Sequence, residues 1–439
     1  MPRSVRTSLM LGVALAVGSP AVVPAQQAAG PFDARIEAAI AKWTPEITAL
    51  RHRIHQNPEL GNQEQETAAL VVEFLRKLGF TEIQTGIATT GITAVLRGGR
   101  PGPFVAVRAD MDALPVVEDT DLPFRSTKRG MWNGRDVGIA HACGHDIHVA
   151  VQLGVAAILS ELRADLPGSV QFIFQPAEEG VEEGHPFGGA QRMLAEGIWR
   201  DRRPDAVFGL HAAGGMPVGM LSWSVGPLSA ASDRFVARVH GVQGHGARPQ
   251  ETVDPIVVAS QVVLGWQTIA SRNVPPVQSV VITTGMFQSG DRENIIPAMA
   301  ELRGTVRTHS PQVRDLVERR MREVIDGIAA SAGARAEFDY RRGYPSVIND
   351  TTLAHRMRGT LERAVGPQRV IVRGPEMTGE DFSYFANETP GHFFGLGTLV
   401  PGTTSGPHHS PTFRADDSAI PVGMRAMTFV LVDYLVMRP

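Results

Sequence analysis

Short apolar runs alternate with helix-like segments along the first half of the chain, and this alternation constrains the fold more than any other feature. The apolar runs cover residues 92–96, 104–108, 170–174 and 206–210. A helical pattern lies between the second and third runs, at about 147–162, and Asp146 stands where a helix N-cap belongs. Strands that alternate with helices are typical of an α/β layer with a largely parallel sheet. We therefore predict this fold class for the larger part of the protein.

The pattern changes near residue 226 and returns to its first form after residue 341. Strand-like and helix-like segments follow in the order β-α-β-β-α-β, at 234–239, 255–271, 277–287, 300–308, 311–330 and 335–340. This is the order of a ferredoxin-like sandwich. Because 439 residues are too many for one simple core, we predict two domains. The larger domain comprises 31–225 and 342–439, and a small α+β domain, 226–341, is inserted into it.

The first 25 residues have the composition of a signal peptide. Arg3 and Arg6 form a basic start, residues 9–17 are apolar but too few to span a membrane, and Ala25 is suited to cleavage. We expect a periplasmic or secreted protein with no membrane span after cleavage. The net charge of -3 gives no reason to expect a nucleic-acid partner.

The one cysteine of the chain, Cys143, stands in the segment His-Ala-Cys-Gly-His-Asp-Ile-His at 141–148. A single thiol in an oxidising compartment cannot form a disulfide within the chain, but a metal ion would occupy it. Cys143 and His145 are two residues apart and cannot share a helical face, so we expect a loop to present them. We interpret His141 and His148 as supporting residues rather than ligands.

Acidic residues and a histidine follow three of the predicted strands. Asp110 and Asp112 follow the second strand, Glu178 and Glu179 the third, and His211 the fourth. Ligands of open α/β sheets bind outside the carboxyl ends of the strands, so these side chains should meet at one edge. Thiolate, imidazole and carboxylate together favour zinc, with manganese or cobalt as substitutes. The candidates exceed the four ligands of one tetrahedral ion, which indicates two divalent ions.

Several other residues have both a structural and a functional interpretation. One carboxylate of the Glu178-Glu179 pair can bind metal while the other stays free as a general base. Taken alone, His245 is interpreted as an exposed loop histidine, and Asn294 as a turn residue. The pair His408-His409 either lies in an exposed loop or supplies a metal ligand from near the end of the chain.

Taken together, these segments resemble the metal-dependent amidohydrolases of the aminoacylase/carboxypeptidase superfamily, in the branch of hippurate hydrolase and the auxin-amino-acid conjugate hydrolases. The matching stretches are 55–60 (HQNPEL), 108–115 (RADMDALP), 141–148 (HACGHDIH), 175–180 (QPAEEG), 209–211 (GLH), 294–297 (NIIP), 301–307 (ELRGTVR), 380–382 (EDF) and 409–411 (HSP).

The resemblance implies a zinc-peptidase-like catalytic domain with an inserted dimerisation (lid) domain, in a homodimer or higher homo-oligomer. It implies that Glu178 is the general base, that Asp112 orients a ligand, and that His245 reaches the active site of a second subunit to stabilise the oxyanion. The implied metal ligands are Cys143, His145, Glu179, His211 and His409. The implied substrate-binding residues are Asn294, Arg303 and Glu380.

The chain departs from the pattern of this family at two places. It has Gly246 and Gln250 in the loop after His245, where relatives often have alanine and a second histidine. It also has His408 where an apolar residue is expected, so His408 competes with His409 as the late ligand, although the His-Ser-Pro match favours His409.

The resemblance implies hydrolysis of the amide bond of N-acyl amino acids by a water that the metal activates, with aromatic or ochratoxin-type amides within the range of the family. A metallo-carboxypeptidase or dipeptidase on the same scaffold is the nearest alternative. A cysteine hydrolase with Cys143 as nucleophile would leave the double glutamate without a role. A periplasmic metal- or peptide-binding protein is the non-enzymatic alternative. Acyl and amino-acid specificity do not follow from the sequence.

Overall fold

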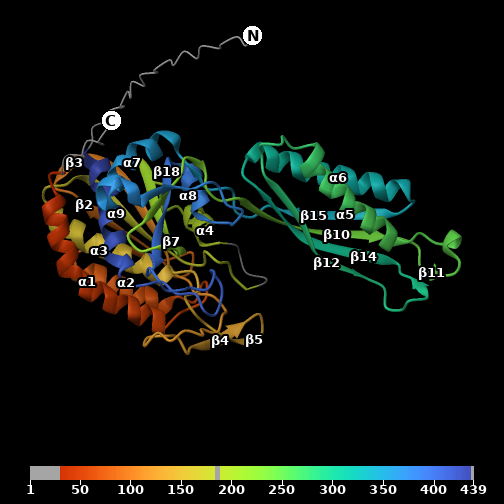
Figure 1. The fold of residues 1–439 in the computed structure, drawn as a ribbon, viewed down its shortest axis with the longest axis horizontal. Helices are drawn as coiled ribbons and strands as arrows, with labels where there is room; N and C mark the ends of the chain where they lie inside the picture. Colours follow the sequence, from red (N-terminus) through yellow and green to blue (C-terminus); the bar gives the residue numbers. More distant parts are fainter. Residues whose placement is uncertain (1–29, 183–187, 437–439) are drawn as a thin grey trace, which may run out of the picture.

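A computed structural model of the protein describes residues 30–182 and 188–436. The described chain forms two bodies, a larger one around an eight-stranded sheet and a smaller one around a four-stranded sheet (Figure 1). The predicted signal peptide, 1–25, lies outside the described residues.

The large sheet has the strand order β1-β2-β6-β3-β7-β18-β8-β17. Its strands are β1 (Glu82–Ile87), β2 (Gly91–Arg97), β3 (Arg100–Asp110), β6 (Pro167–Gln175), β7 (Ala206–Pro217), β8 (Leu221–Trp223), β17 (Val370–Val372) and β18 (Gly391–Leu399). The central strands β6, β3, β7 and β18 run parallel, whereas β1 and β2 are antiparallel to their neighbours, and β8 is antiparallel to β18. The expected parallel sheet is therefore found at the centre, and the edges make the sheet mixed.

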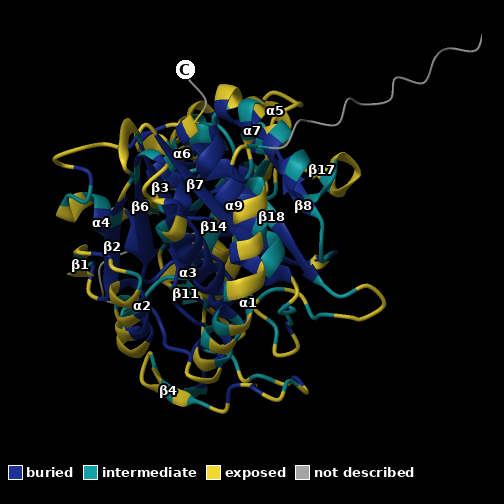
Figure 2. Ribbon diagram, turned by 90° about the vertical axis from the view of Figure 1, so that its left-hand side faces the viewer, coloured by how far each residue is buried: buried dark blue, intermediate teal, exposed yellow. Residues whose placement is uncertain are grey.

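Helices cover both faces of this sheet, and alternate residues of β3 show the division. Val105 and Val107 belong to the core cluster shared with the long helices α1, α3 and α9, whereas Ala106 between them joins the cluster below α4 and α8. The helices of the larger body are α1 (Asp33–Gln56), α2 (Gln65–Lys77), α3 (His145–Leu162), α4 (Gly189–Glu196), α7 (Thr351–Val365), α8 (Phe382–Glu388) and α9 (Ala419–Val436). Strands covered on both faces are buried along most of their length, which explains their continuous apolar runs (Figure 2).

Helix α9 is long and apolar enough by composition to cross a membrane, but 72% of it is buried inside the protein. It packs against α1, α3 and α7 in the main core, where its two sides contact other helices and the sheet. An apolar helix of this kind is a core helix of the larger body.

The expectation that Asp146 caps helix α3 is wrong. The helix begins at His145 after Gly144, whose φ of 91° is left-handed, and Asp146 lies inside the first turn. The Asp146 carboxylate instead accepts hydrogen bonds from Arg51 and His55, both at 2.8 Å. The expectation that a loop presents both the thiol and the imidazole is therefore right for Cys143 but wrong for His145, which is the first residue of α3.

The smaller body has the sheet order β12-β14-β10-β15, with all neighbours antiparallel. Its elements are β10 (Ala231–His240), β11 (Gly244–His245), α5 (Pro255–Arg272), β12 (Val280–Ser289), β13 (Ile295–Ile296), β14 (Met299–Thr308), α6 (Pro311–Ser331) and β15 (Arg335–Arg341). Both helices pack on one face of the sheet around the fully buried Trp266. This arrangement is the ferredoxin-like α+β sandwich that the sequence predicts.

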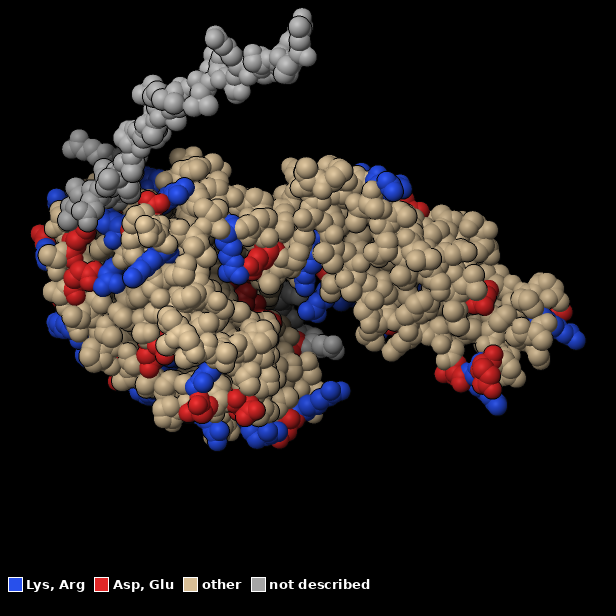
Figure 3. Space-filling view, viewed as in Figure 1, with Lys and Arg blue, Asp and Glu red and all other residues tan. Residues whose placement is uncertain are grey.

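Two short strands mark where the chain leaves the larger body and returns to it. Strand β9 (Gly226–Pro227) pairs antiparallel with β16 (Ile348–Asn349). Elsewhere, a β-hairpin made of β4 (Arg129–Trp132) and β5 (Arg135–Gly138) projects from the larger body. Figure 3 shows a hollow between the two bodies, on the side where the carboxyl ends of the central strands lie.

Candidate metal centre and active site

The chain brings four of the predicted ligands together beside the amino end of α3. Cys143 precedes this helix, His145 begins it, Glu179 follows β6, and His211 lies in β7. Cys143 and His145 are buried, whereas Glu179 and His211 are partly exposed. The start of α3 and the segment after β6 supply Cys143, His145 and Glu179, as the rule for open α/β sheets predicts. The expectation that His211 follows its strand is wrong, because β7 continues to Pro217 and His211 lies within it.

The thiol of Cys143 is shared by two groups of possible ligands. In one group it lies with His211 and His408, and in the other with Glu179 and His409; within each group the donor atoms are within 4.8 Å of one another. The Nε2 atom of His409 is 2.9 Å from Oε1 of Glu179. A shared thiolate between two donor groups fits a centre for two ions better than a centre for one.

His145 is oriented as a metal ligand would be. Its Nδ1 lies 2.8 Å from the carbonyl oxygen of Asp112 and 3.3 Å from Oδ1 of the same residue. Its Nε2 is buried and has no hydrogen-bond partner among the described residues. Buried polar atoms are normally hydrogen bonded, so a free Nε2 beside carboxylates and a thiol fits the metal that the donor set implies.

His148 differs from His145 because both of its ring nitrogens are engaged. Nδ1 lies 2.5 Å from Oδ1 of Asp110, and Nε2 accepts the N–H of Ala212 at 2.7 Å. No lone pair of this ring remains for a metal. His141 is buried too, with both nitrogens unpaired among the described residues, and nothing in the structure explains this.

Three side chains from separate segments hold the backbone that carries the two glutamates. Glu64, just before α2, accepts the N–H of Ala177 at 2.9 Å, and Asp112 accepts the N–H of Glu179 at 2.9 Å. The hydroxyl of Tyr344 donates to the carbonyl of Glu178 at 2.6 Å. Ala177 has a φ of 52°, which is uncommon for alanine. The surrounding bonds therefore hold this turn in an otherwise unfavourable conformation.

The two neighbouring glutamates have opposite electrostatic surroundings. Burial, together with the charges of Glu380, Glu179 and Asp381, raises the pKa of Glu178 well above its usual range. Burial also acts on Glu179, but its hydrogen bond to His409 and the nearby His145 lower its pKa. Glu179 is thus ready to bind a cation, and Glu178 is ready to hold a proton, which is the division of roles that the sequence suggests.

A fully buried arginine balances part of the negative charge around Glu178. Arg108 pairs with Asp110 at 2.7 Å, with Asp381 at 2.8 Å and with Glu380 at 3.0 Å. The predicted substrate-binding residue Glu380 is therefore in this network, and its carboxylate also lies within 4.8 Å of those of Glu178 and Asp381.

The anionic surroundings bear on the cysteine-nucleophile alternative. Burial and the charges of Glu179, Glu178 and Asp110 raise the pKa of the Cys143 thiol well above its usual range. A nucleophilic cysteine needs the opposite, a lowered pKa from cationic neighbours. The surroundings of Cys143 are therefore suited to a cation and not to a free thiolate.

Three predicted site residues lie in the smaller body, away from this centre. His245 is in β11 and exposed, and its register partner on β13, Ile295, directly follows Asn294. Figure 1 places β11 at the end of the smaller body farthest from the larger one. Arg303, in β14, pairs with Glu301 at 2.7 Å. Within one chain, these residues do not meet the metal-binding groups.

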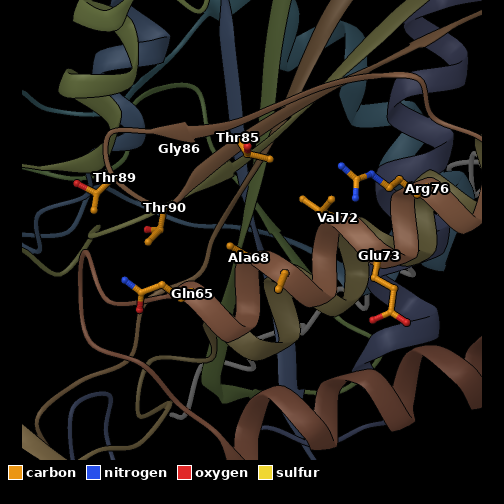
Figure 4. A pocket seen from close by; sticks show the side chains of 10 residues that line it. Gln65, Ala68, Val72, Glu73, Arg76, Thr85, Gly86, Thr89 and Thr90 are labelled. Carbon is orange, nitrogen blue, oxygen red and sulfur yellow. The ribbon is translucent and has the colours of Figure 1, made fainter.

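An open groove of about 530 Å³ lies between α2 and β1, at a different place on the larger body (Figure 4). Ala68, Val72, Glu73, Arg76 and Thr85 are among its lining residues, and it shares no lining residue with the candidate metal centre.

Sequence reasoning missed Glu64, Tyr344, Arg108 and Asp381 as parts of the site. Glu64, Arg108 and Asp381 are in or beside segments that carry the family resemblance, but no local spacing gives them a role. The contacts from Glu64 to Ala177, from Arg108 to Asp381 and from Tyr344 to Glu178 form only when segments separated by more than 100 residues meet.

A family model described as Peptidase family M20/M25/M40 matches residues 106–433. The chain belongs to this family. Among its relatives is the N-acetylcysteine deacetylase of Bacillus subtilis, 38% identical over 373 residues, which are 85% of this chain and 92% of the relative. Another is the IAA-amino acid hydrolase ILR1-like 2 of Arabidopsis thaliana, 36% identical over 393 residues, which are 89% of this chain and 85% of the relative.

A solved M20 structure agrees with the fold. The YxeP protein of Bacillus subtilis, described as a dinuclear metal-binding peptidase, has a TM-score of 0.75 and 34% identity, over 89% of this chain and 98% of that one. The resemblance to the metal-dependent amidohydrolases and to their auxin-conjugate branch is thereby confirmed. The M20 chain described here is an enzyme, a hydrolase of this superfamily.

Proposed function

We propose that this M20 hydrolase cleaves the amide bond of N-acyl amino acids outside the cytoplasm, using two divalent ions. The observation that carries the proposal is the convergence of Cys143, His145, Glu179 and His211 beside the buried Glu178. In this proposal Glu178 stays free of metal and acts as the base. The thiolate and imidazole donors favour zinc, and cobalt or manganese can substitute.

Glu178 transfers protons in this mechanism. When bound, the two ions supply Lewis acidity, which polarises the scissile carbonyl and activates water. Glu178 takes a proton from the attacking water and passes it to the leaving nitrogen. A carboxyl group with a raised pKa is suited to both steps, because it holds the proton between them.

His245 requires a second copy of the chain to take part in this reaction. It stabilises the oxyanion in our proposal, but in the single chain it lies at the far end of the smaller body. Exposed apolar side chains support an interface there: Leu264 on α5 is 70% exposed, and Met286 and Phe287 on the edge strand β12 are 43% and 41% exposed. We therefore propose a homodimer formed through the smaller body.

Amine release tests the proposed activity. The purified chain is assayed on N-acetyl and N-benzoyl amino acids and on dipeptides, first with a chelator and then after addition of zinc, manganese or cobalt. Hydrolysis of N-acyl amino acids that stops with the chelator and returns with metal is the expected result. A preference for dipeptides would favour the carboxypeptidase or dipeptidase alternative. No hydrolysis by the folded, metal-loaded chain would contradict the proposal and favour a binding protein.

A further inference from the structure

Two adjacent histidines lie near the Cys143 thiol, and each belongs to a different group of possible metal ligands. His409 is the residue that matches the family pattern, and it contacts Glu179. His408 stands where an apolar residue is expected, yet it does not face away from the centre. Its Nδ1 is 3.5 Å from the sulfur of Cys143, and its ring lies 5.3 Å from the ring of His211.

The distances around the sulfur match those of a metal-ligand set. The Nε2 atom of His211 is also 3.5 Å from the sulfur. With zinc–sulfur and zinc–nitrogen bonds of about 2.3 and 2.0 Å at a tetrahedral angle, a nitrogen and a sulfur on the same ion lie about 3.5 Å apart. Both nitrogens therefore stand at the separation from the thiol sulfur that a shared tetrahedral ion requires.

Hydrogen bonding alone explains this arrangement less well. One thiol has one proton and can donate to only one of the two imidazoles. The Nδ1 of His211 lies 2.7 Å from the carbonyl oxygen of Ala212, so it carries the proton and the Nε2 facing the sulfur has a lone pair. A cation satisfies both nitrogens and the sulfur together.

A backbone hydrogen bond and an aromatic contact hold the loop that carries the two histidines. The N–H of His409 donates to the carbonyl of Ala142 at 2.8 Å, beside Cys143. His409 has a φ of 66°, in the left-handed region, which a histidine adopts more readily than most residues. On its other side, the ring of His408 packs against Phe413, with ring centroids 4.7 Å apart. The position of His408 is therefore built into the loop.

We propose that His408 is a metal ligand of this chain and forms, with Cys143 and His211, a thiolate and bis-imidazole set for one divalent ion. Glu179 then serves the other ion with His409 and His145, both of which lie near its carboxylate. The Cys143 thiol belongs to both groups of donors. This inference rests on the metal centre of the proposed function, but not on its substrate. Two imidazoles and a thiolate select zinc or cobalt over manganese, because manganese prefers oxygen donors.

The test measures metal binding without substrate. The metal-free chain is titrated with Co²⁺, and the bound equivalents, the dissociation constants and the near-ultraviolet thiolate-to-cobalt band are recorded. His408→Leu restores the apolar residue expected at this position, His408→Gln is a polar alternative, and His355→Leu is the control at an exposed histidine.

In both His408 variants we expect the dissociation constant of one of the two bound ions to rise by at least about 10-fold and the thiolate-to-cobalt band to change. Loss of even an outer supporting residue costs about 10- to 100-fold in metal affinity. The control should bind like the wild type. Circular dichroism of the metal-free proteins checks the fold, and if His408→Leu does not fold, His408→Gln decides. Unchanged affinity and an unchanged band in a folded His408 variant would overturn the assignment.

The outcomes for the ligand and for the activity are separate. Two bound ions with a His408-dependent band but no hydrolysis would contradict the proposed activity and leave the ligand assignment standing. Chelator-sensitive hydrolysis, together with metal binding that does not depend on His408, would support the proposed activity and contradict the ligand assignment.

Discussion

Glu178 and Glu179 are neighbours in the chain, but their side chains have different surroundings. Glu179 lies beside His409 and near His145, whereas Glu178 lies among Glu380, Asp381 and Arg108. The difference in role therefore comes from the groups that each carboxylate faces and not from the residue type.

Replacement of Glu178 by glutamine is expected to separate proton transfer from metal binding. The amide cannot take a proton from water, so kcat should fall by at least about 10²-fold, while the bound metal stays at the wild-type level. The matched variant Glu179→Gln should instead lose metal affinity. Steady-state kinetics and metal analysis of both variants check this, and near-normal turnover of Glu178→Gln would refute its role as the base.

His55 links stability to pH through the charge network beside α3. Burial opposes its charged form, but Asp146 at 2.8 Å and Glu118 outweigh burial and raise the pKa of His55 to about 9. Because the pKa in the folded state lies above the unfolded value, the stabilisation is complete below about pH 6.5 and is lost as the pH rises through 9.

Urea unfolding of the metal-free chain between pH 6 and 10 is expected to detect this loss. The free energy of unfolding should fall by on the order of 3 kcal/mol across this range in the wild type, beyond the fall in His55→Gln. The exposed histidine variant His355→Gln should follow the wild type. Equal pH dependence in wild type and His55→Gln would show that His55 is not the group responsible.

At the scale of elements, the conformation of the turn after β6 depends on a residue from another element, Glu64 at the start of α2. Glu64 lies at the start of α2, fully buried, and its carboxylate contacts both Ala177 and Thr90. Burial, with the charge of Asp112, raises the pKa of Glu64 to about 8. We infer that Glu64 positions the backbone that carries Glu178 and Glu179.

This positioning role predicts a difference between two Glu64 variants. Glu64→Ala leaves the buried N–H of Ala177 without an acceptor, which costs about 1–3 kcal/mol in stability, and should lower kcat more than it raises KM. Glu64→Gln keeps an acceptor oxygen and should restore most of kcat. Glu73→Gln, at an exposed position of the same helix, is the control. If glutamine were no better than alanine, the bond to Ala177 would not be the cause.

The sequence predicted the central elements better than the edges of the sheet. Strands β3, β6, β7 and β18 are buried on both faces and therefore have long apolar runs. The edge strand β1 is mostly exposed, and β8 and β17 have three residues each, so their patterns carry little signal. The buried helix α9 was not predicted, because a helix that is apolar on all sides has no amphipathic period.

Cys143, His145 and Glu179 were predictable because they border α3 or follow β6, where the chain direction fixes the edge of the sheet. His211, inside β7, and His409, in the loop before α9, were predicted from a strand that proved longer and from the family resemblance. The supporting residues were not predictable, since an isolated Glu64 or Tyr344 has no local spacing to set it apart. The same limit applies to Asp146, whose position near a helix start suggested a cap. Its true partners, Arg51 and His55, are more than 90 residues away.

At the scale of the whole molecule, the two bodies divide the proposed machinery. The metal-binding groups and Glu178 are in the larger body, and His245 is in β11 of the smaller body, at its far end (Figure 1). An exposed histidine in this place can act only on a different copy of the larger body, unless the two bodies move far toward each other. The two explanations predict different behaviour of mixed variants.

Mixing two inactive variants is expected to restore activity if His245 acts on the second subunit. Glu178→Gln lacks the base and His245→Ala lacks the oxyanion group, but a mixed dimer has one site with both. Random exchange of subunits makes half of the dimers mixed, so about a quarter of the wild-type activity should return. Each variant alone, and a mixture kept below the concentration at which dimers form, are the controls. Activity that stays at the sum of the two single variants, in a sample shown by sedimentation to contain exchanged dimers, would mean that His245 acts within its own chain or takes no part.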